Sequence, residues 1–518
     1  MLKSIIWAEN DNRVAFDDYS FVEALDIKTL ININRSKKFG EKERELCEFF
    51  SVCAETLELR QELFIELLSN KTLFDDLNTS FETLSSIYEL QNQKDTAESN
   101  EKLLYSVREI EAYVEYLSKI KSIFTTIAPK SKALQILWES IKPLCDGKDF
   151  ENLCTSVEKQ SHEIKNIKSI TIGVNLDSQL KPSEAGVLSI NDESFVSGDY
   201  INKLLRLDFK NNRYYCPAPL LPLNHKLTNE EMDIIRSSLN SAMNKILSSS
   251  LKNWSGIVKK HVINNLRDLS NILYEWRFVS VCIQILFELK EAGFALCKPE
   301  IGTSDEVSAL YHPILALSSL NKSSVIKNEL NFGNDSSIYI LTGPNQGGKS
   351  IYTQSVGIMY AMLHLGLLIP ASKAVLRYVD NIFIHFIDIR KRSYVHGRLS
   401  DECNKIQSIN KLITKDSLFL FDEALSSTNA TEAVAISTEI ITAYLEIGAK
   451  GIFATHFHEL CALSEEYSGI DNLTAQIDES SHKRIFKIIR GNHGKSYAFD
   501  IAQAYGLTKA EILKNNKN

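Results

Sequence analysis

The chain has 518 residues, 44% of them hydrophobic and 24% charged, with a net charge of -8. These values exclude an intrinsically disordered chain, and the acidic balance excludes a protein that binds polyanions through overall positive charge. The length favours about two to four domains. The nine cysteines contain no C-x-x-C pair. Neither a zinc module nor a disulfide framework is therefore predicted, and scattered cysteines are typical of a reducing cytosol.

The N-terminal part of the chain is predicted to be helical. Residues 1–40 are expected to form a cap segment with one short helix over Phe21–Leu30. From about residue 41 to 168 the chain is nearly free of glycine and proline, and apolar residues recur three and four positions apart. Such periodicity without helix breakers predicts long helices.

A change of composition predicts a small strand-bearing insert, at about residues 165–225. Two β-rich runs, Ser169–Leu176 and Gly186–Ile190, are separated by turn residues. Helical periodicity resumes from about Asn229 to Gly293. We therefore expect a mainly α-helical region over residues 41–298, in which two helical arms carry the small β insert at their tips.

Residues 299–518 alternate short apolar runs with helical patterns, which predicts an α/β domain with parallel strands at the C-terminus. The candidate buried strands are Ile338–Leu341, Leu418–Phe421 and Ile452–Ala454. The longest apolar stretch, Val356–Ile369, is shorter than the roughly 18 to 20 residues that a membrane span needs. We interpret it as a buried helix and expect a cytoplasmic protein without a membrane segment.

The stretch ILTGPNQGGKS, residues 340–350, fits the pattern G-x-x-x-x-G-K-[ST] and lies between a predicted strand and a predicted helix. The N–H groups of such a loop and the N-terminus of the following helix form an anion site. Lys349 is predicted to reach the β and γ phosphates, and the Ser350 hydroxyl to bind Mg²⁺. The candidate nucleotide-binding residues are Gly343, Pro344, Asn345, Gln346, Gly347, Gly348, Lys349 and Ser350.

Two further strand ends supply candidate catalytic and metal-binding groups. Asp422 and Glu423 follow the apolar run Leu418–Phe421. Asp422 is predicted to hold Mg²⁺, directly or through water, and Glu423 to orient or deprotonate the attacking water. Two adjacent acids after a strand are often only a solvated turn, but the upstream phosphate loop favours the catalytic interpretation. His456, after another predicted strand, is a candidate sensor of the γ-phosphate or of its attacking water.

In order and approximate spacing, five segments resemble the ATPase domain of the MutS family of DNA mismatch-repair proteins. These segments are T-G-P-N-x-G-G-K-S at 342–350, the strand ending in Asp422-Glu423, F-A-T-H-F-H-E-L at 453–460, S-Y-A-F-D-I-A at 496–502 with Gly506-Leu507, and Tyr311-His312-Pro313. The resemblance implies an ABC-type P-loop ATPase domain that uses ATP and Mg²⁺ and dimerises head to tail across two nucleotides. It also implies that the helical arms are a lever and clamp that enclose DNA.

The departures from the family pattern lie at the expected dimer seam. The family's S-T-F-x-x-E appears as G-R-L-S-D-E at 397–402, where only Glu402 matches, and G-R-G-T-S appears as L-S-S-T-N at 425–429, where only Thr428 is kept. Phe21-Val22-Glu23 fits the F-x-E motif of the family's mismatch readers, but it lies in a short amphipathic segment. We interpret this match as coincidence and expect no mismatch reading through a Phe wedge.

These observations predict an ATP-dependent DNA-binding homodimer of the MutS-like group. It would bind and hydrolyse ATP at a composite dimer site to control the grip on duplex or branched DNA. The alternative is an ATP-switched scaffold or anti-recombination regulator that acts mainly through a protein partner. The acidic balance and the altered seam motifs keep this alternative open. Basic residues near the insert could contact DNA phosphates or be solvated helix faces. They are Lys159, Lys165, Lys168, Lys181, Lys252, Lys259, Lys260 and Arg267.

Overall fold

A computed structural model describes most of the chain and divides it into two units. The described residues are 3–11, 15–31, 44–96, 99–165, 168–176, 178–180, 182–194, 196–197, 215–216, 264–319, 324–333, 336–344, 347–386, 397–477, 484–491, 508–509 and 512. The helical unit comprises residues 1–3, 72–129 and 135–274, and the sheet unit comprises residues 4–71, 130–134 and 275–518. The boundaries of these two units differ from those of the predicted segments 1–40, 41–298 and 299–518. The three predicted segments, as functional domains, stay a prediction. In the described ranges, no helix is both long and apolar enough to cross a membrane.

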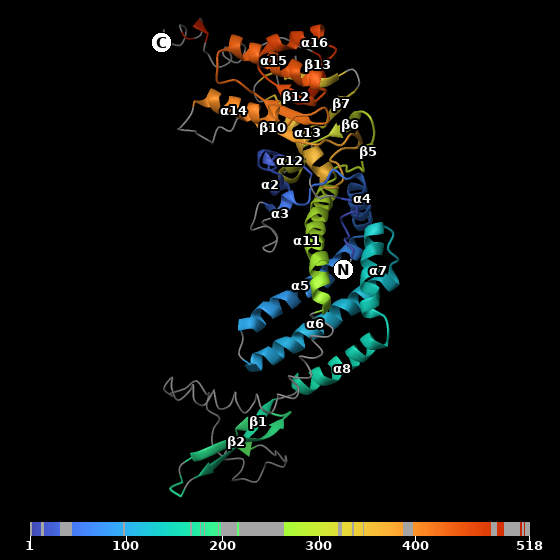
Figure 1. Cartoon of the computed structure of the whole chain (residues 1–518), viewed down its shortest axis with the longest axis vertical. Helices are drawn as coiled ribbons and strands as arrows, with labels where there is room; N and C mark the ends of the chain where they lie inside the picture. Colours follow the sequence, from blue (N-terminus) through green and yellow to red (C-terminus); the bar gives the residue numbers. More distant parts are fainter. Residues whose placement is uncertain are drawn as a thin grey trace. The chain divides into compact units, whose positions relative to one another are not determined.

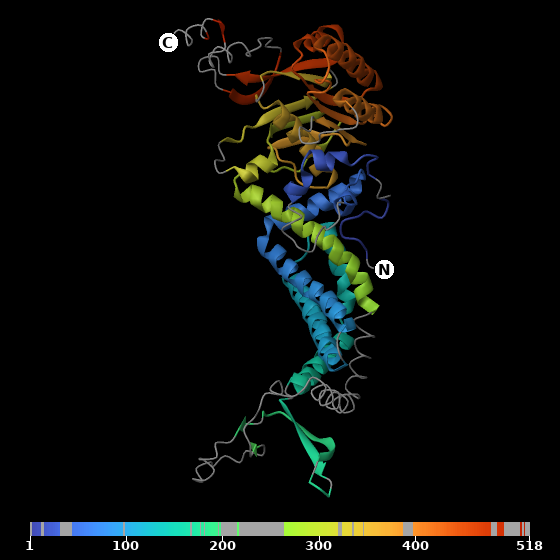
Figure 2. The same cartoon turned by 90° about the vertical axis from the view of Figure 1, so that its left-hand side faces the viewer.

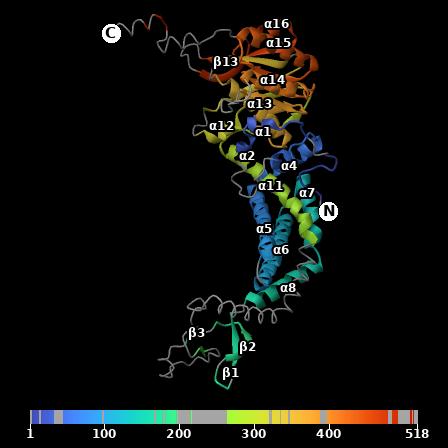
Figure 3. The same ribbon diagram turned by 60° about the vertical axis from the view of Figure 1, so that its left-hand side comes forward.

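Long helices build the helical unit, as the breaker-free sequence predicts. They are α5 (Lys71–Thr96), α6 (Ser99–Thr126), α7 (Lys132–Cys145), α8 (Lys148–Lys165) and the first turns of α11 (Asn264–Glu291). Helices α5 and α6 lie side by side (Figures 1 and 3), where Gln91 Nε2 donates a hydrogen bond to Glu109 Oε1 at 2.6 Å. Tyr88 Oη donates to the carbonyl oxygen of Leu266 at 2.7 Å, which fixes α5 to α11.

The predicted strand insert is an antiparallel hairpin of β1 (Ser169–Leu176) and β2 (Pro182–Asn191), followed by the short parallel pair β3 (Val196–Ser197) and β4 (Tyr215–Cys216). Ser189 Oγ donates to Thr171 Oγ1 at 2.9 Å across the hairpin. Of the eight basic residues named as possible DNA contacts, Lys168 is described and exposed. The side chains of the other seven lie outside the described residues.

The N-terminal segment packs into the sheet unit, where Figure 2 shows its blue helices. Its helices are α1 (Ser20–Ala24), α2 (Ile27–Ile31), α3 (Arg44–Cys47) and α4 (Ala54–Ser69). The single helix predicted over Phe21–Leu30 is therefore wrong, because Asp26 at a φ of 53° separates α1 from α2. Phe21 is fully buried, with ring centroids 5.4 Å from Phe16 and 5.2 Å from Phe50. A core position agrees with a coincidental F-x-E match.

A six-stranded sheet forms the centre of the sheet unit, in the order β10-β11-β12-β8-β13-β14. The strands are β8 (Ser336–Thr342), β10 (Ile382–Phe386), β11 (Leu418–Asp422), β12 (Lys450–Ala454), β13 (Gly469–Ile477) and β14 (Arg484–Arg490). All neighbours pair in parallel except β13 and β14. The three strands predicted from apolar runs are thus confirmed. Because β8, β11 and β12 are parallel neighbours or next neighbours, the loops after them meet at one edge.

Helices cover both faces of this sheet. The helices are α13 (Lys349–His364), α14 (Arg398–Asn410), α15 (Ala430–Ile447), the 3₁₀ helix η3 (His458–Ala462) and α16 (Leu463–Glu466). Phe419 and Phe421 of β11 pack in one core cluster with residues of α14 and α15. Leu420 points the other way, where a Cβ added at Gly357 of α13 would lie 2.9 Å from its side chain. The stretch Val356–Ile369 is buried as predicted, but the predicted helix ends at His364, the last residue of α13.

A second sheet of four strands, in the order β5-β9-β6-β7, belongs to the same unit. Its strands are β5 (Glu300–Ile301), β6 (Asp305–Leu310), β7 (Asn328–Phe332) and β9 (Lys373–Leu376), and α12 (Pro313–Ser318) follows β6. Asp305 joins the two sheets, since its carboxylate accepts hydrogen bonds from Arg377 Nε at 2.9 Å and from Lys450 Nζ, at the start of β12, at 3.0 Å.

Candidate nucleotide-binding site

The loop between β8 and α13 requires glycine at two positions. Gly343 has a φ of 131°, and a Cβ there would lie 2.9 Å from the Cβ of Ala475. Gly348, the N-cap of α13, has a φ of 99°, and its carbonyl oxygen accepts the Tyr352 N–H at 2.9 Å. Left-handed backbone at these positions is open to glycine and strained for other residues. Asn345 and Gln346 lie outside the described residues, so their predicted contacts remain predictions.

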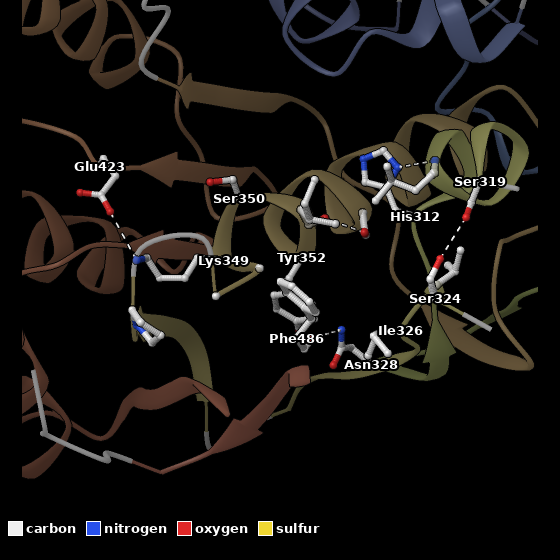
Figure 4. A pocket seen from close by; sticks show the side chains of 17 residues that line it. His312, Ser319, Ser324, Ile326, Asn328, Lys349, Ser350, Tyr352, Glu423 and Phe486 are labelled. Atoms are coloured by element: carbon white, nitrogen blue, oxygen red, sulfur yellow. Dashed lines mark hydrogen bonds and ion pairs between the residues drawn. The ribbon is translucent and has the colours of Figure 1, made fainter. Parts of the chain in front are cut away.

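Lys349 is folded back over the loop. Its Nζ donates to the carbonyl oxygen of Gly343 at 2.9 Å and lies 3.5 Å from Glu423 Oε1 (Figure 4). The Lys349 side chain is 5% exposed. The loop thus encloses a positive charge at the N-terminus of a 16-residue helix, which is the arrangement that binds phosphate groups.

Asp422 and Ser350 form a site suited to a hard cation. Asp422 ends β11 and is buried, and its Oδ1 has no hydrogen-bond partner among the described residues. Burial raises the pKa of the Asp422 carboxyl, while a hydrogen bond from the Ser350 hydroxyl lowers it. A buried oxygen without a partner costs about 1–3 kcal/mol. Carboxylate and hydroxyl oxygens are ligands that Mg²⁺ prefers, so this donor set fits that ion.

Glu423 occupies a strained turn beyond the strand end. Its φ is 56°, in the left-handed region, and its N–H donates to the carbonyl oxygen of Ala454 at 2.9 Å. The carboxylate is hydrogen-bonded to His456 Nδ1 and also faces Lys349. Such a conformation at a non-glycine residue costs on the order of 1–3 kcal/mol and is frequent at functional sites. The structure therefore brings Glu423 and His456 together beside the loop.

A cavity of about 660 Å³ extends from the loop to α12, β7 and β14 (Figure 4). It is lined by His312, Leu315, Ser319, Ser324, Val325, Ile326, Asn328, Pro344, Gly347, Gly348, Lys349, Ser350, Ile351, Tyr352, Ser355, Glu423 and Phe486. Lys349 and Glu423 lie at one end of the drawn residues, Phe486 lies in the middle beside Tyr352, and Ser319 and Ser324 lie at the other end (Figure 4). Sequence reasoning missed Leu315, Ile326, Asn328 and Phe486, because they belong to no motif and come from separate elements.

His312 has a structural role in the wall of this cavity. Its Nδ1 accepts the backbone N–H of Leu315 at 3.3 Å and so caps α12. Burial lowers the pKa of His312, and a hydrogen bond with the Gln354 side chain of α13 raises it. The segment Tyr311-His312-Pro313, noted for its resemblance, therefore attaches the second sheet's helix to the helix of the phosphate loop.

The segments expected at a dimer seam start two helices. Gly397 is the N-cap of α14, and Glu402 in its second turn has a buried Oε2 without a hydrogen-bond partner in the described ranges. Leu425 is buried at a φ of 60°, and Asn429 Oδ1 accepts the Thr431 N–H at 2.9 Å to cap α15. Where the family has G-R-G-T-S, this chain has L-S-S-T-N. In this run, Leu425 supplies a buried side chain and Asn429 caps a helix.

The fold and the site define a phosphate-loop α/β domain of the kind that binds nucleotides. The family model MutS domain V matches residues 339–518. Residues 339–518 therefore form a MutS domain V, and the chain is similar to curated proteins of the MutS family.

Three of these relatives show how much of the chain is shared. The DNA mismatch repair protein MutS of Fusobacterium nucleatum is 28% identical over 467 residues, which cover 87% of this chain and 48% of that protein. The Endonuclease MutS2 of Staphylococcus haemolyticus is 27% identical over 403 residues, 74% of this chain and 48% of that protein. The MutS protein of Fervidobacterium nodosum is 34% identical over 225 residues, 42% of this chain and 27% of that protein. The chain therefore spans at most about half the length of these relatives.

Proposed function

We propose that this protein binds and hydrolyses ATP at the cavity and uses the ATP cycle to change its grip on DNA. One observation carries the first half of the proposal. Lys349, Ser350 and Glu423 line the cavity, with Asp422 hydrogen-bonded to Ser350, and Tyr352, Ile326 and Phe486 add an apolar and aromatic part to the same cavity. A triphosphate and a purine base have this same division between a charged part and a flat apolar part.

The charged part of the site has a role for each residue. Lys349 and the loop N–H groups bind the β and γ phosphates, and Ser350 with Asp422 holds Mg²⁺. When bound, Mg²⁺ neutralises charge that develops on the phosphates. Glu423 orients or deprotonates the attacking water, and His456 holds the Glu423 carboxylate in place. Because Lys349 already faces Glu423 at 3.5 Å, an arriving phosphate competes for the lysine and releases the carboxylate.

The second half of the proposal concerns DNA. The similar proteins are named for DNA mismatch repair and as an endonuclease. We assign DNA holding to the helical unit with its β1–β2 hairpin, and the composite ATP site to a homodimer whose seam includes residues 397–402 and 425–429. Since Phe21 is in the core, DNA would be recognised by shape, as duplex or branched structure, and not by a Phe wedge.

A binding panel tests this function. Duplex, mismatched, three-way and four-way DNA are titrated at controlled salt, with ADP and with a non-hydrolysable ATP analogue. We expect affinity that falls with salt and differs between the two nucleotides. Absence of affinity for every DNA would overturn the DNA half. Retention of a protein partner by the ATP-bound form, without DNA, would instead support the alternative of an ATP-switched regulator.

A further inference from the structure

We infer that Asn328 is a positioning residue for the base of the nucleotide, because it holds the backbone of Phe486, whose ring lines the cavity beside Tyr352. The inference rests on the proposed function, since it concerns how the same site binds ATP. It is carried by the hydrogen bonds between β7 and β14, which are the two elements that bring Asn328 and Phe486 to the cavity.

Phe486 is in a backbone conformation that needs support. Its φ is 58°, although it is an aromatic residue inside β14, and its side chain is 45% exposed. Left-handed backbone is an outlier for a bulky residue and is strained. A Cβ added at Gly348 would lie 3.4 Å from Phe486 Cδ1, so the ring rests against the last glycine of the phosphate loop. This position suits stacking against a base whose phosphates occupy that loop.

Asn328 supplies the support from the neighbouring sheet. It is the first residue of β7 and is only 7% exposed. Its Oδ1 accepts the N–H of Ile488 at 2.8 Å, and its Nδ2 donates to the carbonyl oxygen of Phe486 at 3.5 Å (Figure 4). One amide thereby binds the backbone of β14 at Phe486 and two residues beyond it. The Lys487 Nζ, between them, donates to the Lys327 carbonyl oxygen at 2.5 Å.

The same strand also holds the phosphate loop's helix. The carbonyl oxygen of Glu329, next to Asn328, accepts a hydrogen bond from Tyr352 Oη at 2.8 Å. Tyr352 lies in the first turn of α13, and Figure 4 shows its ring beside Phe486. Strand β7 therefore sets the spacing between the wall for the base and the loop for the phosphates. Asn328 holds the wall for the base, and the Glu329 carbonyl oxygen holds the helix that follows the phosphate loop.

Because Asn328 supports only the wall for the base, removing its amide is predicted to weaken binding of the base and not of the phosphates. The phosphate loop keeps its glycines, Lys349 and the Tyr352 bond, so it binds polyphosphate as before. Phe486, once released, leaves its strained conformation, and the base loses its stacking wall. Binding of a ligand with a base is therefore weakened, whereas binding of a ligand without a base is not. A merely structural role for Asn328 would weaken both ligands together.

The experiment compares ATP with inorganic tripolyphosphate, both with Mg²⁺, by calorimetric titration of the full chain. For Asn328→Ala we expect about a tenfold higher Kd for ATP and a Kd for tripolyphosphate within twofold of wild type. Phe486→Ala should show the same pattern. The double variant should bind ATP no more weakly than Phe486→Ala alone, because both changes remove one wall. Equal weakening of both ligands, unchanged ATP affinity, or multiplied effects in the double variant would overturn the inference.

Two further variants keep the outcome interpretable. Asn328→Asp has nearly the same volume and still accepts from Ile488, but cannot donate to Phe486, so it should show a smaller selective loss. It carries the test if the alanine variant does not fold. Lys349→Ala should weaken both ligands. A wild-type chain that binds neither ligand contradicts the proposed function, whereas wild-type binding with an unselective Asn328 variant contradicts only this inference.

Discussion

Replacing Asp305 with asparagine is predicted to destabilise the sheet unit strongly, because it leaves a buried cation without its counter-charge. Asp305 is fully buried, and its carboxylate accepts hydrogen bonds from Lys450 at 3.0 Å and from Arg377 at 2.7 Å. Lys450 is 5% exposed and lies 4.7 Å from the Tyr360 ring centroid. Asparagine has a similar volume, so the substitution removes charge while leaving little cavity.

The expected magnitude follows from the burial of each partner. Removing one member of a buried ion pair costs about 3–5 kcal/mol, because the remaining charge is uncompensated. Arg377 is 38% exposed and can turn to solvent, so its share is small. Lys450 carries nearly the whole cost. We therefore expect the free energy of unfolding to fall by about 3 kcal/mol at pH 7, where Lys450 is charged.

The loss should depend on pH in a defined direction. Burial lowers the pKa of Lys450 to about 8, although Asp305 raises it. Between this value and about 10.4, the ordinary lysine pKa, the unfolded chain holds a proton that the folded chain has released. Stability contributed by this group therefore rises with pH across that window. In Asp305→Asn, neutral Lys450 costs little, so the difference from wild type should shrink at pH 9.5.

Urea unfolding followed by tryptophan fluorescence and far-ultraviolet circular dichroism measures this effect. Asp416→Asn is the matched control, since Asp416 is an exposed carboxylate whose charge also acts on Lys450. It should change stability by no more than about 0.5 kcal/mol. Adding Lys450→Met to Asp305→Asn should recover part of the loss. Equal effects of the two asparagine variants, or no recovery with Lys450→Met, would refute the reasoning.

Three further predictions concern two residues of the candidate site and His364 at the buried end of α13. Lys349→Ala should raise the Kd for ATP at least tenfold in a titration, because it removes the enclosed ammonium. Glu423→Gln should bind ATP normally but hydrolyse it about 10²-fold or more slowly in a phosphate-release assay; a wild-type rate would show that the assigned base is wrong. Buried His364 has its pKa lowered to about 4, so the free energy of unfolding should fall by about 2 kcal/mol from pH 6.5 to 5, and less in His364→Asn.

The candidate site residues that the sequence predicts are those whose chemistry is local. A phosphate loop needs glycines, a lysine and a hydroxyl at fixed spacing, because one turn of backbone must surround the anion. The acid at the end of β11 was equally visible, since an apolar strand places it at the sheet edge. In the structure Lys349 Nζ lies 3.5 Å from Glu423 Oε1, and the Ser350 hydroxyl hydrogen-bonds to Asp422; their roles toward a nucleotide stay predictions.

The apolar half of the site had no such local signal. Phe486 and Asn328 are 158 residues apart and follow no motif, yet a hydrogen bond joins them at the cavity. Strand pairing and the approach of β7 to β14 decide this proximity, and neither is encoded in a short window. The loop asparagine and glutamine, Asn345 and Gln346, lie outside the described residues, so their roles stay predictions.

The sequence alone predicts the long helices of the helical unit, the strands β8, β11 and β12, the phosphate-loop pattern and the acids that follow β11. Hydrophobic period and glycine position depend on neighbours along the chain, so they can be read directly. Tertiary structure alone decided which buried faces meet. The N-terminal segment packs in the sheet unit, where His364 at the end of α13 hydrogen-bonds through Nδ1 to the Ser51 carbonyl oxygen at 2.8 Å. Periodicity shows that a face is buried, but its partner depends on shape and hydrogen bonding between distant segments.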